Sequence, residues 1–169
     1  MKKIGVLVVS LLFCFCLTAG SSAQTKASFA GGLGSYSQKG KSSEFQAFYA
    51  SYYFHPAIKI RGEISRFSTS TGQEITSLMV GGIYTVTSFR LLEGEVILRP
   101  YIGSGMGRLL LPAESAMQVV AGVEFANKAT DENLSLVLEL KYLISSMAVE
   151  SERAYSDGLF CGFFLNIKI

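Results

Sequence analysis

The stretch Leu134-Ser-Leu-Val-Leu-Glu-Leu-Lys-Tyr-Leu-Ile-Ser145 alternates between two kinds of side chain. One set of alternate positions is entirely apolar or aromatic, namely Leu134, Leu136, Leu138, Leu140, Tyr142 and Ile144. The other set carries Ser135, Glu139, Lys141 and Ser145 beside Val137 and Leu143. A period of two is that of a β-strand, whose successive side chains point to opposite faces. The stretch is therefore predicted to be a strand with one apolar face and one charged face.

The same alternation recurs along the chain. It marks four further strands at 58–65, 95–107, 117–126 and 159–169, although Ile97 falls on the polar side of its segment. Three more strands are expected near 26–36, 45–54 and 75–86, where Gly, Tyr, Phe and Val leave the apolar face undecided. Eight strands between residues 24 and 169 leave about 18 residues for each strand and its link. This suits strands of about 9–11 residues, which cross a bilayer when tilted.

The first 23 residues have the order of an export signal. Lys2 and Lys3 precede an uncharged run from Ile4 to Leu17, and small residues follow. Ser21 and Ala23 suit the −3 and −1 positions, so cleavage is predicted after Ala23, leaving residues 24–169 as one domain. An N-terminal membrane anchor is the alternative, but the run is short for a transmembrane helix. Cys14 and Cys16 each follow Phe, which does not match a lipoprotein signal.

Composition excludes several classes of protein. Of the 169 residues, 49% are hydrophobic and only 17% charged, against about 25% in typical soluble domains. After residue 23 no apolar run reaches the ~18 residues of a transmembrane helix. Removing the signal leaves 13 basic and 13 acidic residues, so nucleic-acid binding has no electrostatic basis. Cys161 then stands alone, and no internal disulfide is possible.

The links between strands alternate in character. His55-Pro56, Thr87–Gly94 and Asn127–Asn133 form one set, and Ser37–Glu44, Ser68–Glu74, Gly107–Ser115 and Ser146–Asp157 form the other. Odd and even links of an eight-stranded barrel lie on opposite rims, so the second, more hydrophilic set is expected outside the cell. Leu109, Leu110 and Leu111 with Pro112 are either a ligand- or partner-binding loop or the upper ends of two strands.

The polar face decides between a membrane barrel and a soluble one. A soluble barrel buries its apolar face, whereas a membrane barrel presents that face to lipid. The polar positions carry balanced charges and many glycines, which suit a crowded interior better than a solvated sheet face. The charged residues predicted to line the lumen are Lys59, Arg61, Glu63, Glu95, Arg99, Glu124, Glu139, Lys141 and Lys168. They form either a packed polar plug or the lining of a narrow pore.

Two internal segments and the C-terminus resemble a known family. Arg99-Pro-Tyr-Ile-Gly-Ser-Gly-Met-Gly107 and Ala121-Gly-Val-Glu-Phe125 are similar to segments of the outer-membrane β-barrel domain family, the small OmpA/OmpX-like barrels. The resemblance covers most of residues 26–169 and implies an all-β, eight-stranded antiparallel up-and-down barrel in the outer membrane. Gly158–Ile169 resembles the C-terminal signal read by the barrel-assembly machinery, with Phe163, Leu165, Ile167 and Ile169 on one face. That signal normally ends in an aromatic residue, and here the last residue is Ile169.

Candidate catalytic chemistry is sparse. His55 is the single histidine and precedes Pro in a predicted turn, and one histidine with one thiol does not make a zinc site. Gly103-x-Gly105-x-Gly107 lacks the following helix of a nucleotide-binding loop. Cys161 falls on the apolar face, where it is interpreted as a small apolar residue rather than a reactive thiol. No cofactor or metal is expected.

The sequence therefore predicts a small, non-enzymatic outer-membrane barrel with a structural, surface-interaction or minor-permeability role. The first alternative is a secreted or periplasmic lipocalin-like barrel that binds a small apolar ligand, although the chain lacks Trp and so the lipocalin Gly-x-Trp motif. The second is a lipid A-modifying enzyme, which generally needs a histidine beside Ser or Asp.

Overall fold

The computed structural model describes residues 27–70, 72–110, 113–128, 133–145 and 157–169. Its strands are β1 (Ala27–Gln38), β2 (Lys41–His55), β3 (Ile58–Ser68), β4 (Glu74–Thr85), β5 (Phe89–Leu91), β6 (Val96–Leu110), β7 (Ala113–Asn127), β8 (Leu134–Ser145) and β9 (Gly158–Lys168). A 3₁₀ turn, η1 (Leu92–Gly94), links β5 to β6. The predicted segments 1–23, with the cleavage site at Ala23, and Leu111-Pro112 lie outside the described residues.

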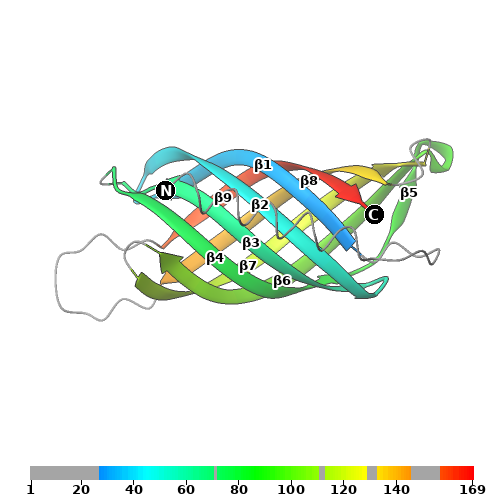
Figure 1. Cartoon of the computed structure of the whole chain (residues 1–169). Coiled ribbons are helices and arrows are strands. Elements are labelled where there is room, and N and C mark those ends of the chain that lie inside the picture. The colour runs from blue at the N-terminus through cyan, green and yellow to red at the C-terminus, as the bar shows by residue number, and fades with distance from the viewer. Residues whose placement is uncertain (1–26, 71, 111–112, 129–132, 146–156) are drawn as a thin grey trace.

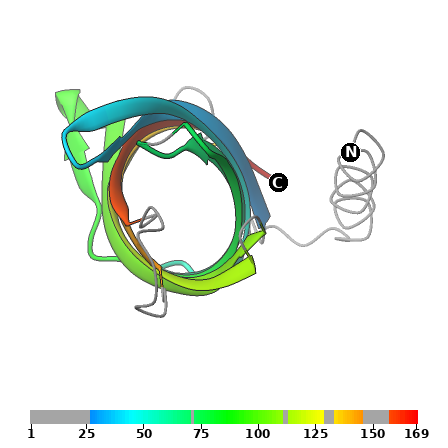
Figure 2. The same cartoon turned by 90° about the vertical axis from the view of Figure 1, so that its left-hand side faces the viewer.

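The eight long strands form a closed up-and-down barrel. Neighbours in sequence pair antiparallel, β9 returns to β1, and β4 pairs with β6. The β1–β9 ladder runs from Ser28↔Lys168 to Ser37↔Leu159, and main-chain hydrogen bonds join Ala27 to Ile169 at its end. Figure 1 shows the tilted strands from the side, and Figure 2 shows the ring that they enclose. The predicted eight-stranded all-β fold is confirmed, and closure removes the exposed edges of an open sheet.

The two rims differ in which strand ends they carry. The N/C rim carries Ala27 and Ile169, together with the last residues of β2, β4 and β7 and the first residues of β3, β6 and β8. The opposite rim carries the last residues of β1, β3, β6 and β8 and the first residues of β2, β4, β7 and β9. Lys39 and Gly40 make the two-residue β1–β2 turn with positive φ at both positions (49° and 76°), the geometry that matches the twist of a hairpin.

Several strands are longer than the sequence predicted. β1 and β2 extend into the link expected at 37–44, and β6 and β7 extend through most of that expected at 107–115. Leu109 is fully buried and Leu110 lies on the outer wall, so both belong to a strand end. The link expected at 87–94 holds β5, which pairs with Val96–Leu98 of β6. Figure 2 shows the β5–β6 hairpin outside the ring of long strands.

The outer wall is apolar over most of the described strands. Leu136, Leu140 and Ile144 of β8 are 43–49% exposed, while Val137 and Leu143 between them are buried at 2% and 1%. Phe163, Leu165 and Ile167 of β9 are likewise exposed, while Phe160 and Phe164 point inward. Charge thus lies inside the barrel and hydrocarbon outside, which is the inverse of a soluble barrel.

Candidate functional site

A compact ion-paired group, the middle layer, crosses the barrel interior. It consists of Arg61 and Glu63 on β3, Glu139 and Lys141 on β8, and Tyr101 on β6. On each of β3 and β8 the two charged residues stand two positions apart along the strand, so both point inward from the same face. Barrel closure brings β3 opposite β8, although 78 residues separate Arg61 from Glu139 along the chain.

The contacts of the middle layer balance its charges. The Arg61 guanidinium donates to both carboxylate oxygens of Glu139, at 2.5 Å and 3.3 Å, and also lies 3.3 Å from Glu63. Lys141 forms an ion pair with Glu63, and the Tyr101 hydroxyl donates to Glu139 at 2.6 Å. All five residues are 3% exposed or less. Two bases face two acids, so the layer is neutral despite its burial.

A second charged group, the lower group, lies toward the N/C rim. Arg99 and Glu124 are direct cross-strand partners on β6 and β7, with a contact of 3.2 Å. Lys168 on β9 reaches the same Glu124 oxygen at 2.5 Å. The Lys59 amine stands 5.3 Å and 5.4 Å from the ring centres of Tyr53 and Tyr101, within the range of a cation–π contact. The lower group therefore has three bases around one acid.

An aromatic cluster fills the interior toward the opposite rim. Its members are Tyr36, Phe45, Phe67 and Phe160, all 2% exposed or less. Phe160 lies 4.5 Å, 4.9 Å and 5.1 Å from the ring centres of Tyr36, Phe67 and Phe45, in tilted and edge-on arrangements. The Lys141 amine sits 4.6 Å from the Phe160 ring centre, so the cluster rests directly on the middle layer. The cluster and the middle layer thus occupy successive levels along the barrel axis.

Interior glycines make room for the large rings. A Cβ placed on Gly122 would stand 2.4 Å from Tyr101 Cζ, and one on Gly162 would stand 2.6 Å from Phe45 Cζ. These distances are far below van der Waals contact, so the tips of the rings occupy the space that a side chain at either glycine would need. The glycine-rich polar face is thus matched to the aromatic side chains that cross the lumen.

The remaining predicted residues fall in different places. Glu95 precedes β6 and is exposed, so the prediction that it lines the lumen is wrong. Ile97, which did not fit the pattern, is buried inside at 6% exposure. Phe163, Leu165, Ile167 and Ile169 all face outward, at 49–59% exposure. Cys161 is also exposed on the outer wall.

Sequence reasoning missed the aromatic cluster for a physical reason. Phe and Tyr occur on both faces of the strands that contribute it, as with inward Phe45 and outward Phe48 on β2. Hydrophobicity alone therefore leaves the inward face of β1 and β2 undecided, and Phe67 lies beyond the strand predicted at 58–65. The usable signal was the glycines that alternate with apolar residues, because Gly34, Gly122 and Gly162 each lie beneath an inward ring.

Ligand-binding chemistry is sparse among the described residues. His55 lies in the β2–β3 turn, where its Nδ1 accepts a hydrogen bond from the Ala57 N–H at 3.2 Å. No cluster of three or more His, Cys, Asp or Glu side chains in the described ranges could hold a metal ion. Within those same ranges, no helix has the length and apolar character needed to cross a membrane.

Solved structures with the same architecture are membrane barrels. The crystal structure of Neisserial surface protein A superposes with a TM-score of 0.62 at 14% identity, covering 88% of this chain and all of that one. The N-terminal β-barrel domain of Pseudomonas aeruginosa OprF gives 0.57 at 12% identity, covering 86% and 98%. A de novo designed transmembrane β-barrel gives 0.57 at 14%, covering 88% and 100%. No protein-family model and no curated protein sequence matches the chain. The chain therefore has the fold of the small OmpA/OmpX-like transmembrane barrels.

Proposed function

We propose that this chain is a small outer-membrane protein without enzymatic activity, whose barrel serves a structural or surface-interaction role. The observation that carries the proposal is the inverted distribution of polarity. Six charged side chains are almost fully buried inside the barrel, namely Lys59, Arg61, Glu63, Glu124, Glu139 and Lys141, while Leu, Ile, Val and Phe cover its outside. Water cannot stabilise such an exterior, whereas the hydrocarbon of a bilayer can.

The aromatic residues at the rim support the same location. Tyr52 and Tyr84 stand on the outer wall near the N/C rim, each about half exposed, and Phe54 packs against Tyr52 with ring centres 5.1 Å apart. Aromatic girdles of this kind mark the interfaces of membrane barrels. The more hydrophilic set of links is predicted to lie outside the cell. This orientation places the opposite rim, with Lys39, Lys41 and Glu44, at the cell surface and the N/C rim in the periplasm.

The alternatives fit the described interior less well. A lipocalin-like carrier needs an apolar cavity inside, where this barrel has ion pairs and packed rings. A lipid A-modifying enzyme needs an activated nucleophile, and His55 lies at a rim turn with its Nδ1 already accepting a backbone hydrogen bond. The described interior therefore favours a non-enzymatic membrane barrel over either of these two alternatives.

Fractionation of the expressing cells tests the proposal. The chain is expected in the outer-membrane fraction, with gel mobilities that differ between boiled and unboiled samples because the closed barrel resists detergent unless heated. A soluble periplasmic pool with identical mobilities would overturn the proposal.

We also infer that the outward row Phe163, Leu165, Ile167 and Ile169 is read by the barrel-assembly machinery. If so, Ile169→Phe restores the aromatic end of that signal and should raise the assembled fraction in pulse-chase experiments. Equal or slower assembly of this variant would contradict the assignment.

A further inference from the structure

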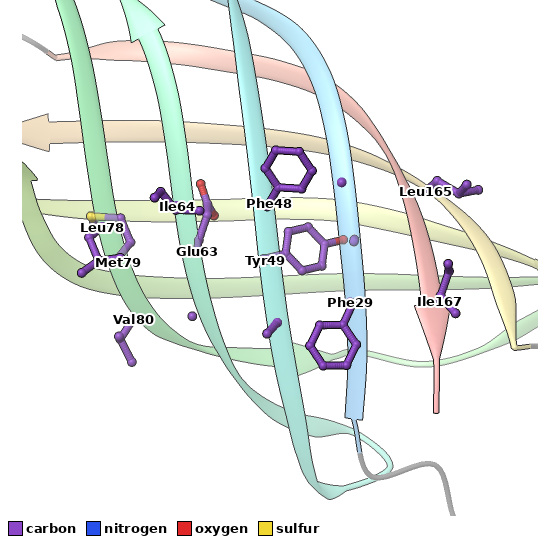
Figure 3. A pocket seen from close by; sticks show the side chains of 14 residues that line it. Phe29, Phe48, Tyr49, Glu63, Ile64, Leu78, Met79, Val80, Leu165 and Ile167 are labelled. Carbon is purple, nitrogen blue, oxygen red and sulfur yellow. The ribbon is translucent and has the colours of Figure 1, made fainter. Parts of the chain in front are cut away.

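The outer wall carries a hollow of about 570 Å³ over β1–β4 and β9. Its floor is formed by Ala50 and Gly62, which are direct cross-strand partners on β2 and β3. Phe29 on β1 flanks this floor on one side and Val80 on β4 on the other. A Cβ placed on Gly62 meets no atom within 4 Å, so the hollow exists because two small residues are adjacent. Figure 3 shows its large side chains, with Phe29, Phe48, Ile64 and Val80 labelled.

The hollow offers only hydrocarbon to an occupant. Phe29, Phe48, Ile64, Leu78, Val80, Leu165 and Ile167 contribute the outward side chains. Tyr49 and Glu63 belong to the same wall, but their side chains are buried in the lumen at 5% and 3% exposure. An occupant with polar groups would lose its hydrogen bonds to water without replacing them. The ligand must therefore be an apolar chain.

The depth of the hollow identifies which part of a lipid reaches it. From Ala50 to Phe54 at the N/C rim, β2 advances about 13 Å at 3.3 Å per residue. A strand tilt near 40° places the hollow about 10 Å inside that rim. Half of a bilayer's hydrocarbon core is about 15 Å thick. The floor of the hollow thus lies at the level of acyl-chain methylenes, about 5 Å inside Tyr52 on β2 and about 10 Å inside Tyr84 on β4.

We propose that this hollow binds one acyl chain of a glycerophospholipid from the periplasmic leaflet. The inference rests on the proposed membrane location. At the hollow an acyl chain enters a trough and gains dispersion contacts on several sides. Continuity of the trough with the lipid-facing wall makes a lipid chain the occupant that is always present. The competing occupants are lipopolysaccharide and a second copy of the barrel.

Two glycines provide a matched test. Gly62→Leu fills the hollow, whereas Gly82→Leu adds the same side chain to β4 at an outward position that does not line it. Neither site offers a steric obstacle, because a Cβ on Gly82 also meets no atom within 4 Å. The full chain and both variants are extracted from membranes in mild detergent, and retained lipids are identified by native mass spectrometry.

The unaltered chain and Gly82→Leu are expected to retain one phospholipid that Gly62→Leu loses several-fold. Equal retention by both variants, or no retained phospholipid on the unaltered chain, would overturn the proposal. So would retained lipopolysaccharide, or a dimer that only Gly62→Leu dissociates. If Gly62→Leu fails to assemble, Ala50→Leu fills the same hollow, with outward Ala121→Leu on β7 as its control.

The fractionation assay separates this failure from failure of the proposed function. Both variants should remain in the outer membrane with heat-dependent mobility. If both variants are in the outer membrane and retain phospholipid equally, only the acyl-chain site is contradicted. A soluble chain would contradict the membrane location itself.

Discussion

Glu139 is the residue on which the interior contacts converge. It accepts hydrogen bonds from Arg61 and from the Tyr101 hydroxyl and is 2% exposed. Glu139→Ala would leave the Arg61 charge with only a shared carboxylate, Glu63, for compensation. Breaking one partner of a buried ion pair typically costs about 3–5 kcal/mol, so we expect a loss of that order in urea unfolding in lipid vesicles.

The Arg66–Glu74 pair provides the control for this prediction. Its side chains are 61% and 63% exposed at the opposite rim. Exposed pairs contribute about 0–1 kcal/mol, so Glu74→Ala should change stability far less. Similar losses for the two variants would show that the middle layer is solvated rather than buried.

Gly122 tests the fit between interior glycines and rings. A Cβ there would meet Tyr101 Cζ at 2.4 Å and the Leu138 carbonyl oxygen at 2.8 Å, so Gly122→Val must displace the ring or the backbone. Overpacking of this kind costs about 1–3 kcal/mol. Gly82→Val faces open space and adds a β-branched residue that suits strands, so its unfolding free energy should hold or rise. Equal destabilisation of both variants would contradict the close approach of Tyr101.

β8 spans the wall with a constant outward face. Leu138 lies near its middle and Leu134 at its first residue. Arginine on the lipid face costs about 2–4 kcal/mol at the bilayer midplane and about 0–1 near the interface. Leu138→Arg should therefore destabilise the barrel in lipid far more than Leu134→Arg. A flat profile along β8 would contradict its transmembrane placement.

The elements differ in how much of them the sequence predicts. β8 alternates cleanly because its inward face carries Glu139 and Lys141, so both strand and parity follow from the pattern. β9 alternates only weakly, since Phe160 and Phe164 fill the interior while Phe163 faces out. Apolar residues on both faces conceal the parity of a strand. The sequence predicts inward positions for the four charged residues of the middle layer but not for Tyr101. Their pairing depends on closure, which brings β3 opposite β8 and leaves no local trace in the sequence.

The whole interior is organised in successive layers. Toward the N/C rim lies the lower group, with three bases around Glu124, followed by the neutral middle layer and then the aromatic cluster. Lys141 joins two adjacent layers, because its amine forms an ion pair with Glu63 in the middle layer and lies against the Phe160 ring of the aromatic cluster. Burying so many charges costs desolvation free energy, which the ion pairs of the buried middle layer offset by neutralising its charges.

Layering of this kind predicts that the barrel conducts poorly. An ion crossing the lumen would have to separate Arg61 from Glu139 and then pass rings whose centres lie 4.5–5.1 Å apart. In planar bilayers we therefore expect small or absent single-channel conductance from the unaltered chain. Large, sustained openings would contradict this and make the middle layer a gate.

The double variant Arg61→Ala/Glu139→Ala tests which layer is the main barrier to ions. If the aromatic cluster is the main barrier, the double variant should conduct as little as the unaltered chain. A large increase in its conductance would instead assign the barrier to the ion pairs.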